Sequence, residues 1–534
     1  MIALIISVPL LAVLWSVTED SEGVWGHLAE TVLSGYIRNT VILAIGVGIS
    51  TPVIGVSTAW LVTNYDFPGA RIFRWALLLP LAIPTYLTAY ALTDLFEFSG
   101  PIQTWLRDLM EWDANDYWFP DMRSLSGAVS ILSLGLYPYV FIAARTGFSS
   151  QSASMLEASH LLGAGPWRRF FSVALPMARP SIFAGLALVL METIAEFGAV
   201  DYCAVDTFST GIYRTWTGRG SLVAASQLSA CLLGVVSLLY LVEFISRRSA
   251  RFHHTSQRSQ SIQPTAILGR QRWLASFVCC IPIVLGFLLP VSRFVCLTIE
   301  AGDARAGELF LELATNSLTL AGIAAASTIT LGLFLAYMRR ESKSVAISSA
   351  VQVAGFGYAI PGGVIAIGIL GPLWWVEDRI LTFTEASTDW DLGLFLSGSI
   401  VAVLLGYQVR FLAIPLNVIS AGFARIRPSI EDAAANLGAT RIQRLFRVHI
   451  PLLTGSLFAA ALVVFVDVLK ELPATLILRP FDFETLAVRV YQLASDERLS
   501  EASTGALAII AAGLVPVILL NRLSTASQAG TNHD

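Results

Sequence analysis

Two pairs of carboxylates stand inside segments that are otherwise apolar. Glu192 and Glu196 are four residues apart, so a helix would place both on one face. Asp467 and Glu471 repeat this spacing in the second half of the chain. Acids inside membrane-spanning helices are costly and are usually functional. Carboxylate oxygens suit a hard trivalent cation. We therefore interpret the four acids as part of a translocation path, with no metal stably bound.

The same acids also have a structural interpretation. They could lie near the outer ends of their helices, or pair with the basic residues Arg214, Arg489 or Lys470. Hydrolysis has less support, because the sequence contains no HExxH or GxSxG motif and its six histidines are scattered. We expect no catalytic residue in this chain, and we do not expect it to be an enzyme.

A nucleotide site of the usual kind is also missing from the sequence. The phosphate-binding motif G-x-x-x-x-G-K-[ST] needs a lysine directly after a glycine. The two lysines, Lys343 and Lys470, do not follow a glycine. If ATP drives transport, ATP and Mg must bind to partner subunits, and we expect no cofactor in this chain.

Membrane-spanning helices must position these side chains. The chain has 534 residues, of which 55% are hydrophobic and 13% are charged, and its mean hydropathy is +0.68. Soluble domains carry about 25% charged residues. We therefore predict an all-α polytopic membrane protein with twelve transmembrane helices. The predicted spans are 1–17, 41–63, 75–95, 125–146, 181–200, 221–245, 273–298, 317–338, 345–372, 393–416, 455–475 and 503–521.

The basic residues predict the orientation. One set of connecting segments holds 21 of the 34 Lys and Arg residues but only six of the 38 acids. By the positive-inside rule this side is cytoplasmic, which places both termini inside. We expect the first span to be a retained helix, because it lacks a basic n-region and an A-x-A-like cleavage site before Thr18. The five cysteines include no CxxC pair, and we expect them to be small core residues.

The chain contains an internal repeat. At an offset of 275, residues 147–216 are identical to residues 422–491 at twenty of 70 positions. Each half contains six predicted spans, so the second half enters the membrane in the same direction and the repeats are parallel. The arginine-rich segment between the halves is expected to be a polar cytoplasmic linker and not a nucleic-acid site. The predicted divisions are 1–246 with the loop 149–176, the linker 247–272, and 273–534 with the loop 424–451.

The polar loop of each half has the features of two short helices joined by a glycine. A capping-box pattern starts at Ser154 in the first loop and at Ser429 in the second. Gly163 and Gly438 stand where the first short helix would end, a position that favours positive φ. We predict a helix–glycine–helix elbow in each half, with an apolar stripe that forms a docking surface used twice. The alternative is that this stripe packs against its own bundle.

The two loops resemble the EAA loop of permease subunits in binding-protein-dependent ABC importers. That loop reads E-A-A, three residues, a glycine, and later an aliphatic–proline pair. The departures are Ser159 at the third motif position and Asp432 in place of the usual glutamate. The resemblance implies a coupling helix that contacts the ATP-binding subunit. The matching residues are Glu157, Ala158, Gly163, Leu175, Pro176, Asp432, Ala433, Gly438, Ile450 and Pro451.

A single chain with two six-helix permease halves is similar to the ferric iron importers of this superfamily, and residues 191–216 and 470–502 resemble that subfamily. This resemblance implies the type I ABC importer permease fold in a bacterial inner membrane. It also implies an extracytoplasmic binding protein that delivers ferric iron, and two copies of an ATPase subunit. Fused thiamine importers share the architecture, so thiamine or another small solute is the alternative cargo. A proton-coupled secondary transporter is the more distant alternative.

Overall fold

The computed structural model is almost entirely helical, and it describes residues 2–151, 159, 161–163, 165–249, 264–301, 306–342, 344–387 and 395–530. Within these residues, eight helices are long and apolar enough to cross a membrane, and up to eleven spans result if each of three bent pairs counts as one. An all-helical polytopic architecture is therefore confirmed, whereas the number of twelve spans is not.

The differences from the predicted spans have two forms. The first predicted span is a shorter apolar helix, Ala3–Thr18. The predicted spans 75–95, 345–372 and 393–416 are each broken into two helical parts, which meet at 93°, 118° and 46° respectively. Apolar length predicted these segments, but hydropathy does not detect where a span bends.

Prolines explain the two sharpest breaks. Pro84 and Pro361 each end an Ala-Ile-Pro sequence, and proline disfavours the helical conformation in the residue before it. Ile83 is accordingly extended, with φ −98° and ψ 123°. The corresponding Ile360 has φ −87° and ψ 105°. A new helix then begins directly after each proline.

The chain folds into two compact units, each built from three separate stretches. One unit comprises residues 30–210, 234–303 and 494–534, and the other comprises residues 1–29, 211–233 and 304–493. Each compact unit thus takes segments from both predicted sequence halves. The division into halves rests on sequence repetition and stays a prediction.

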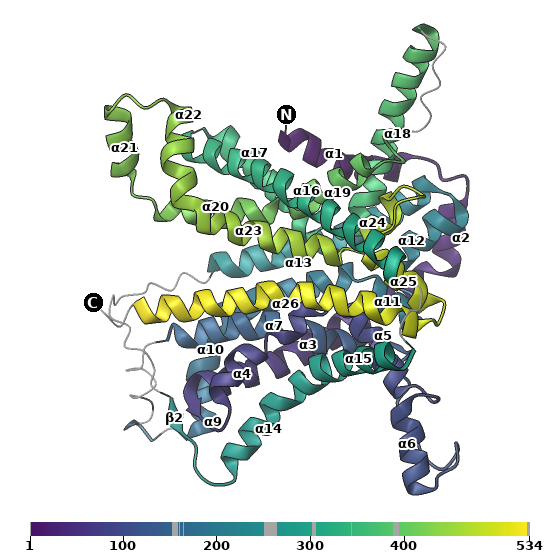
Figure 1. Ribbon diagram of the computed structural model, residues 1–534, viewed down its shortest axis with the longest axis vertical. Coiled ribbons are helices and arrows are strands. Elements are labelled where there is room, and N and C mark those ends of the chain that lie inside the picture. The colour runs from purple at the N-terminus through teal and green to yellow at the C-terminus, as the bar shows by residue number, and fades with distance from the viewer. Residues whose placement is uncertain are drawn as a thin grey trace. The chain divides into compact units, whose positions relative to one another are not determined.

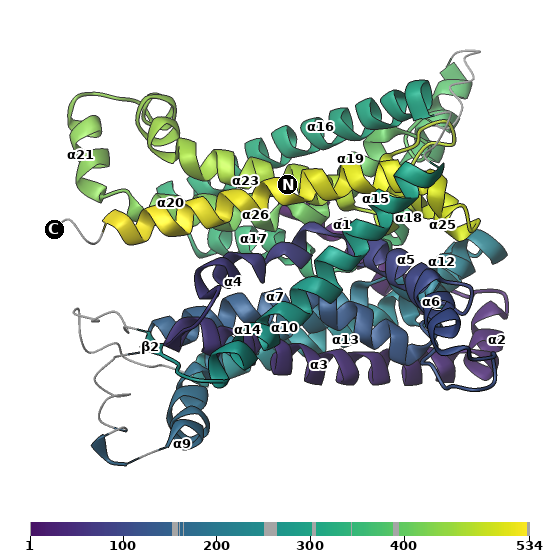
Figure 2. The same cartoon turned by 60° about the horizontal axis from the view of Figure 1, so that its bottom comes forward.

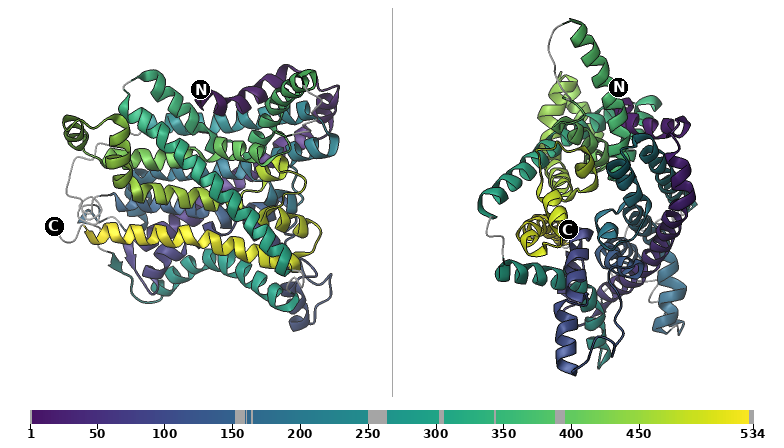
Figure 3. Two further views of the ribbon diagram at one scale, coloured as in Figure 1. Left: turned by 45° about the horizontal axis from the view of Figure 1, so that its top comes forward. Right: turned by 90° about the vertical axis from the view of Figure 1, so that its right-hand side faces the viewer.

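In the unit that contains residues 30–210, the helices α3, α7 and α10 pack against one another (Figure 1). Glycines allow this close packing, since a Cβ atom on Gly55 would lie 2.9 Å from the backbone N of Phe141 and one on Gly185 would lie 2.9 Å from the carbonyl O of Tyr139. The long helix α26 is unbroken (Figure 3) and contacts α15. The elements of this unit are α3 Leu33–Asn64, β1 Tyr65–Asp66, α4 Ala70–Ala76, η2 Leu79–Ala82, α5 Thr85–Phe96, α6 Pro101–Met110, α7 Leu125–Ser149, α9 Pro166–Arg169, η3 Phe170–Ala174, α10 Leu175–Ala195, α11 Gly198–Tyr202, β2 Thr265–Ala266, α14 Gln271–Ile283, η4 Val284–Leu288, α15 Leu289–Ala301 and α26 Leu499–Gly530.

In the other unit, α16, α20 and α23 pack together (Figure 2). Helix α1 contacts α18, where Gly368 leaves room for the carbonyl oxygen of Pro9. The elements of this unit are α1 Ile2–Trp15, η1 Ser16–Thr18, α16 Ala306–Glu341, α17 Val345–Ala354, η5 Gly355–Ala359, α18 Gly362–Ser387, α19 Ile400–Phe411, α20 Ala413–Arg425, α21 Pro428–Asn436, α22 Arg441–Arg444, η6 Leu445–His449, α23 Ile450–Lys470 and α24 Pro473–Leu478. Four helices have residues in both units, namely α2 Val24–Thr31, α12 Phe208–Arg219, α13 Leu222–Ser249 and α25 Leu486–Ser495.

The predicted linker 247–272 is described only at its two ends. Helix α13 continues to Ser249, and residues 250–263 lie outside the described part of the chain. The end of the linker is tied to its unit by a short parallel ladder, in which Tyr65 pairs with Thr265 and Asp66 pairs with Ala266.

Candidate translocation and coupling sites

Two glutamates mark the points where long helices break. Helix α10 ends at Ala195, directly before Glu196, and helix α23 ends at Lys470, directly before Glu471. Both glutamates have extended backbone, with ψ values of 132° and 122°. Gly198 and Pro473 then start the short helices α11 and α24.

Each glutamate caps the short helix that follows it. The amide N–H of Ala199 donates to Glu196 Oε1 at 3.0 Å, and the amide N–H of Ala474 donates to Glu471 Oε1 at 3.2 Å. Since the first N–H groups of a helix have no partner within the helix, both carboxylates have a structural role. The contact is thus the same at two positions that the internal repeat makes equivalent.

The second carboxylate oxygen has a different partner in each case. The hydroxyl of Thr85 donates to Glu196 Oε2 at 2.5 Å. Glu471 instead forms an ion pair with Arg410, whose Nε lies 3.2 Å from Glu471 Oε2. The side chain of Glu471 is only 5% exposed and that of Arg410 is 14% exposed. Glu471 is therefore a neutralised, buried acid.

The partner difference is matched by a reciprocal exchange of small and large residues. At Gly362, a Cβ atom would overlap the guanidinium of Arg410 and would also lie 2.5 Å from Oε1 of Glu471, so a side chain there needs both groups to move. In the internal repeat, Gly362 is equivalent to Thr85 at the offset of 277, and Arg410 is equivalent to Gly135 at the offset of 275. A Cβ atom on Gly135 would lie 3.0 Å from Cγ2 of Thr85. One unit therefore pairs a threonine with a glycine, and the other pairs a glycine with an arginine.

The other two predicted path residues lie one helical turn before the breaks. Glu192 is half-buried on α10, and Asp467 is half-buried on α23, where it interacts electrostatically with Lys470 and Arg410. Arg410, the ion-pair partner of Glu471, was not among the basic residues named in the structural interpretation. Among the described residues, no three His, Cys, Asp or Glu side chains are grouped so that they could hold a metal ion.

The second polar loop forms an elbow of two short helices, α21 and α22 (Figure 1). Gly438 separates them with φ +81°, as predicted for a glycine at a helix end. The predicted capping box at Ser429 is wrong, because α21 begins at Pro428 and has no side-chain cap. A capping box is found instead at Thr440 and Gln443, where it opens α22. Ile450 and Pro451 then begin the long helix α23.

The described part of the first loop has the same plan. Gly163 has φ +79°, helix α9 follows at Pro166, and Leu175 and Pro176 begin the long helix α10. The capping pattern at Ser154 and the motif residues Glu157 and Ala158 lie outside the described residues.

Large apolar side chains are exposed on both elbows. In the first loop, Leu162 is 87% exposed and Phe171 is 56% exposed. At the equivalent positions of the second, Leu437 is 88% exposed and Phe446 is 63% exposed. Asp432 and Ala433 are also exposed. Within the described residues, this stripe is therefore not covered by the chain itself.

The second elbow is joined to the end of α16 by ion pairs that the sequence analysis did not identify. Arg340 Nε lies 3.0 Å from Glu431 Oε1, and Arg444 Nη2 lies 3.1 Å from Glu341 Oε2. The hydroxyl of Tyr337 also donates to the carbonyl O of Arg441 at 2.8 Å. We call Arg340, Glu341, Glu431 and Arg444 the elbow brace. The Arg-Arg-Glu sequence that ends the span was a possible signal of it.

The first elbow is held by aromatic packing. The rings of Phe148 and Phe170 each lie with their centroids 5.2 Å from the ring of Trp60. The side-chain amide of Gln151 donates to the carbonyl O of Ala174 at 2.8 Å. Trp60 is equivalent to Tyr337 at the offset of 277, so corresponding positions support the elbow by different contacts.

Comparisons with known proteins agree with this architecture. The chain is 24% identical to the Fe(3+)-transport system permease protein FbpB 2 of Haemophilus influenzae over 91% of the chain and 89% of that protein. It is 22% identical to the ferric transport system permease protein FbpB of Actinobacillus pleuropneumoniae over 88% of the chain and 69% of that protein. The sulfate transport system permease protein CysT of Escherichia coli is 28% identical over 38% of the chain and 71% of its own length.

A family profile also matches part of the chain. Residues 52–252 match the family described as binding-protein-dependent transport system inner membrane component. This stretch contains the first elbow, the break at Glu196 and the helices α7 and α10. Over residues 52–252, the chain is therefore similar to the permeases of the binding-protein-dependent transport system inner membrane component family.

Proposed function

We propose that this chain is the permease of an ATP-driven importer that moves ferric iron delivered by an extracytoplasmic binding protein. The observation that carries the proposal is the extent of the similarity. Relatives named for Fe(3+) or ferric transport align with 91% and 88% of the chain. Relatives named for sulfate or molybdenum transport align with only 38% and 36% of it. A fused two-half permease accounts for the longer alignments.

We infer that the two elbows couple this permease to its ATPase. Their exposed apolar side chains support this, as does the arrangement of two neighbouring acids. Glu431 faces Arg340 within the chain, whereas Asp432, which occupies the motif position, is exposed. Two elbows call for two copies of the ATPase subunit, which would bind ATP and Mg. Closure of the ATPase pair would push on both elbows and switch the translocation path from inward-facing to outward-facing.

The proposed orientation follows from the same elbows. Arginines surround the second elbow, and an excess of basic residues is typical of cytoplasmic loops. They are Arg425, Arg427, Arg441, Arg444 and Arg447. With the elbows in the cytoplasm of a bacterium and the spans in its inner membrane, both termini are cytoplasmic.

The double substitution Gly163→Asp with Gly438→Asp is expected to abolish association with the ATPase while the permease still inserts. Nothing lies within 4 Å of a Cβ atom at either glycine, and aspartate tolerates the left-handed conformation better than most residues. The new charge therefore acts on the docking partner more than on the fold. Co-purification of the ATPase with the tagged permease measures the effect.

The matched control is Gly163→Asn with Gly438→Asn. Asparagine is as large as aspartate and also tolerates positive φ, but it adds no charge. The control is expected to keep the ATPase bound. Retention of the ATPase by the aspartate variant would refute the docking proposal.

The double substitution Glu192→Gln with Asp467→Asn is expected to lower iron uptake by about tenfold, the effect of losing about 1.4 kcal/mol of transition-state stabilisation. These two acids are chosen because Glu196 and Glu471 already cap helices. Uptake of iron-55 into proteoliposomes containing the ATPase and the binding protein measures the effect, and thiamine serves as competitor.

Each outcome of this uptake experiment is informative. Unchanged uptake with the ATPase still bound would exclude the two acids from the path. Inhibition by thiamine would identify the alternative cargo. Uptake that needs a proton gradient but no ATPase would identify a secondary transporter.

A further inference from the structure

Helix α6 carries an apolar stripe that neighbouring helices leave exposed. Trp105 is 62% exposed and Leu109 is 57% exposed, and they are four residues apart on one side of the helix. Thr104 and Asp108 are exposed on the other side. The helix therefore offers an apolar side and a polar side to its surroundings at the same time.

The boundary between the two sides faces the protein. Gln103 is buried, and its side-chain amide donates to the carbonyl O of Phe96 at 2.7 Å. Its Oε1 accepts a hydrogen bond from the hydroxyl of Tyr117 at 2.7 Å. Tyr117 in turn accepts from Arg107 Nη1 at 2.9 Å. This polar network attaches α6 along one edge and fixes how the helix is rotated about its axis.

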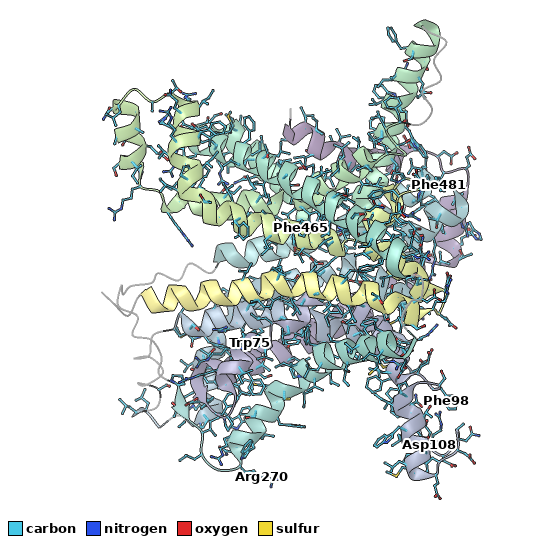
Figure 4. All side chains as sticks on the ribbon, in the orientation of Figure 1. Trp75, Phe98, Asp108, Arg270, Phe465 and Phe481 are labelled. Atoms are coloured by element: carbon cyan, nitrogen blue, oxygen red, sulfur yellow. The ribbon has the colours of Figure 1, made fainter. Side chains whose placement is uncertain are left out.

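The connection to α5 also fixes the direction of α6. Gly100 precedes the helix, and a Cβ atom there would overlap the carbonyl oxygen of Asp94. An ion pair at 2.8 Å between Glu97 and Arg123 ties the turn to the start of α7. As a result, α6 runs across the direction of α7 and α26, away from the end of α5 (Figures 1 and 4). A helix that runs across the spans lies along the membrane plane.

Exposed aromatic residues gather around the same element. Phe98 and Trp118 are 53% and 85% exposed, and Trp112, just after the helix, is 38% exposed. Tryptophan is enriched where the membrane meets water. The guanidinium carbon of Arg107 lies 4.2 Å from the centroid of the Phe98 ring, so this side chain packs over the face of the ring. The chain immediately after α6 is acidic, with Glu111, Asp113 and Asp116.

We propose that α6 is an interfacial helix that lies in the surface of the lipid bilayer. Its apolar side, with Trp105 and Leu109, is buried among the acyl chains just below the headgroups, and its polar side, with Thr104 and Asp108, faces water. A bilayer surface fits both sides at once, because an amphipathic helix at an interface needs one apolar and one aqueous environment. Exposed apolar side chains also occur on α15 of the same unit, where Val295 and Ile299 are 38% and 79% exposed.

Site-directed spin labelling of the full chain in lipid nanodiscs tests this proposal. The native cysteines are replaced by alanine, and a nitroxide is attached to cysteine in the variants Thr104→Cys, Trp105→Cys, Asp108→Cys and Leu109→Cys. Collision rates with oxygen, which concentrates in lipid, are compared with those for a water-soluble nickel complex. We expect oxygen to dominate at positions 105 and 109 and nickel to dominate at positions 104 and 108, so that the logarithm of their ratio changes sign with helical period.

Two results would overturn the proposal. Dominance of nickel at all four positions would mean that the whole helix stands in water. Nickel access at positions 105 and 109 that is lost when the extracytoplasmic binding protein is added would mean that the apolar side is a protein contact. Labels at positions 104 and 108 serve as internal controls, because they are on the same helix but outside the apolar stripe.

Discussion

Replacing Arg410 by glycine is expected to destabilise the chain by about 3–5 kcal/mol, the usual cost of removing one partner of a buried ion pair. Glu471 would then be buried without the guanidinium, although it would still accept the N–H of Ala474. Thermal unfolding of the detergent-solubilised chain measures the loss.

The chain itself suggests how to restore this site. Adding Gly362→Thr to the Arg410→Gly variant reproduces the arrangement of Thr85 and Gly135, in which a threonine hydroxyl donates to the glutamate. We expect the double variant to be more stable than Arg410→Gly alone. By contrast, Gly362→Thr in the native background should be destabilising, because its Cβ would overlap the guanidinium of Arg410.

The reciprocal exchange therefore predicts that the effects of Arg410→Gly and Gly362→Thr on stability do not add. Residues in contact typically show interaction free energies of about 0.5–3 kcal/mol in a double-mutant cycle. Additive effects of the two substitutions would show that Thr85 and Arg410 do not fill equivalent roles. Ser99→Ala, at an exposed position remote from this contact, serves as the control for handling of the detergent-solubilised protein.

Some features of the fold could be predicted from local sequence because their physical cause is local. Proline restricts the residue before it, which accounts for the breaks at Pro84 and Pro361, whereas the third Ala-Ile-Pro, which ends at Pro415, lies in the first turn of α20. A glycine after a short amphipathic stretch marks a helix end, and Gly163 and Gly438 have the positive φ that this implies.

Contacts between distant segments could not be predicted in the same way. The partner of Glu471 is Arg410, which lies on the separate helix α19 and was not among the basic residues considered from the sequence. The capping box also shifted from Ser429 to Thr440, because Pro428 at the first turn already starts α21. The composition of the compact units depends on packing between segments far apart in the sequence, which periodicity does not encode.

The two elbows occupy equivalent positions in the internal repeat but are held by different kinds of contact. Trp60 and Phe170 hold the first elbow through ring contacts, which are apolar and insensitive to salt. The elbow brace holds the second through charges that are between 15% and 26% exposed. Screening weakens such pairs as ionic strength rises. We therefore infer that the two elbows transmit a push with different sensitivity to salt and to charge substitutions.

The substitution Arg340→Glu is expected to reduce iron transported per ATP hydrolysed by about tenfold, equivalent to about 1.4 kcal/mol, while the ATPase stays bound. The new glutamate would face Glu431 and lose the hydrogen bond to the carbonyl O of Ile426. The start of the elbow would then lose its tie to α16, while the Arg444–Glu341 pair and the outer surface of the elbow are unchanged. Transport and ATP hydrolysis are measured together in proteoliposomes with the ATPase and the binding protein.

The charge exchange Arg340→Glu with Glu431→Arg is the decisive comparison, because it restores opposite charges with the direction reversed. If the brace positions the elbow, the exchange recovers much of the iron transported per ATP hydrolysed. Raising the salt concentration should then lower this ratio in the native chain, as Arg340→Glu does. The neighbouring variant Asp432→Asn changes the docking surface and not the brace, so it should weaken ATPase association and leave transport per ATP unchanged. Loss of ATPase association in Arg340→Glu itself would show that the brace shapes the docking surface and does not transmit the push.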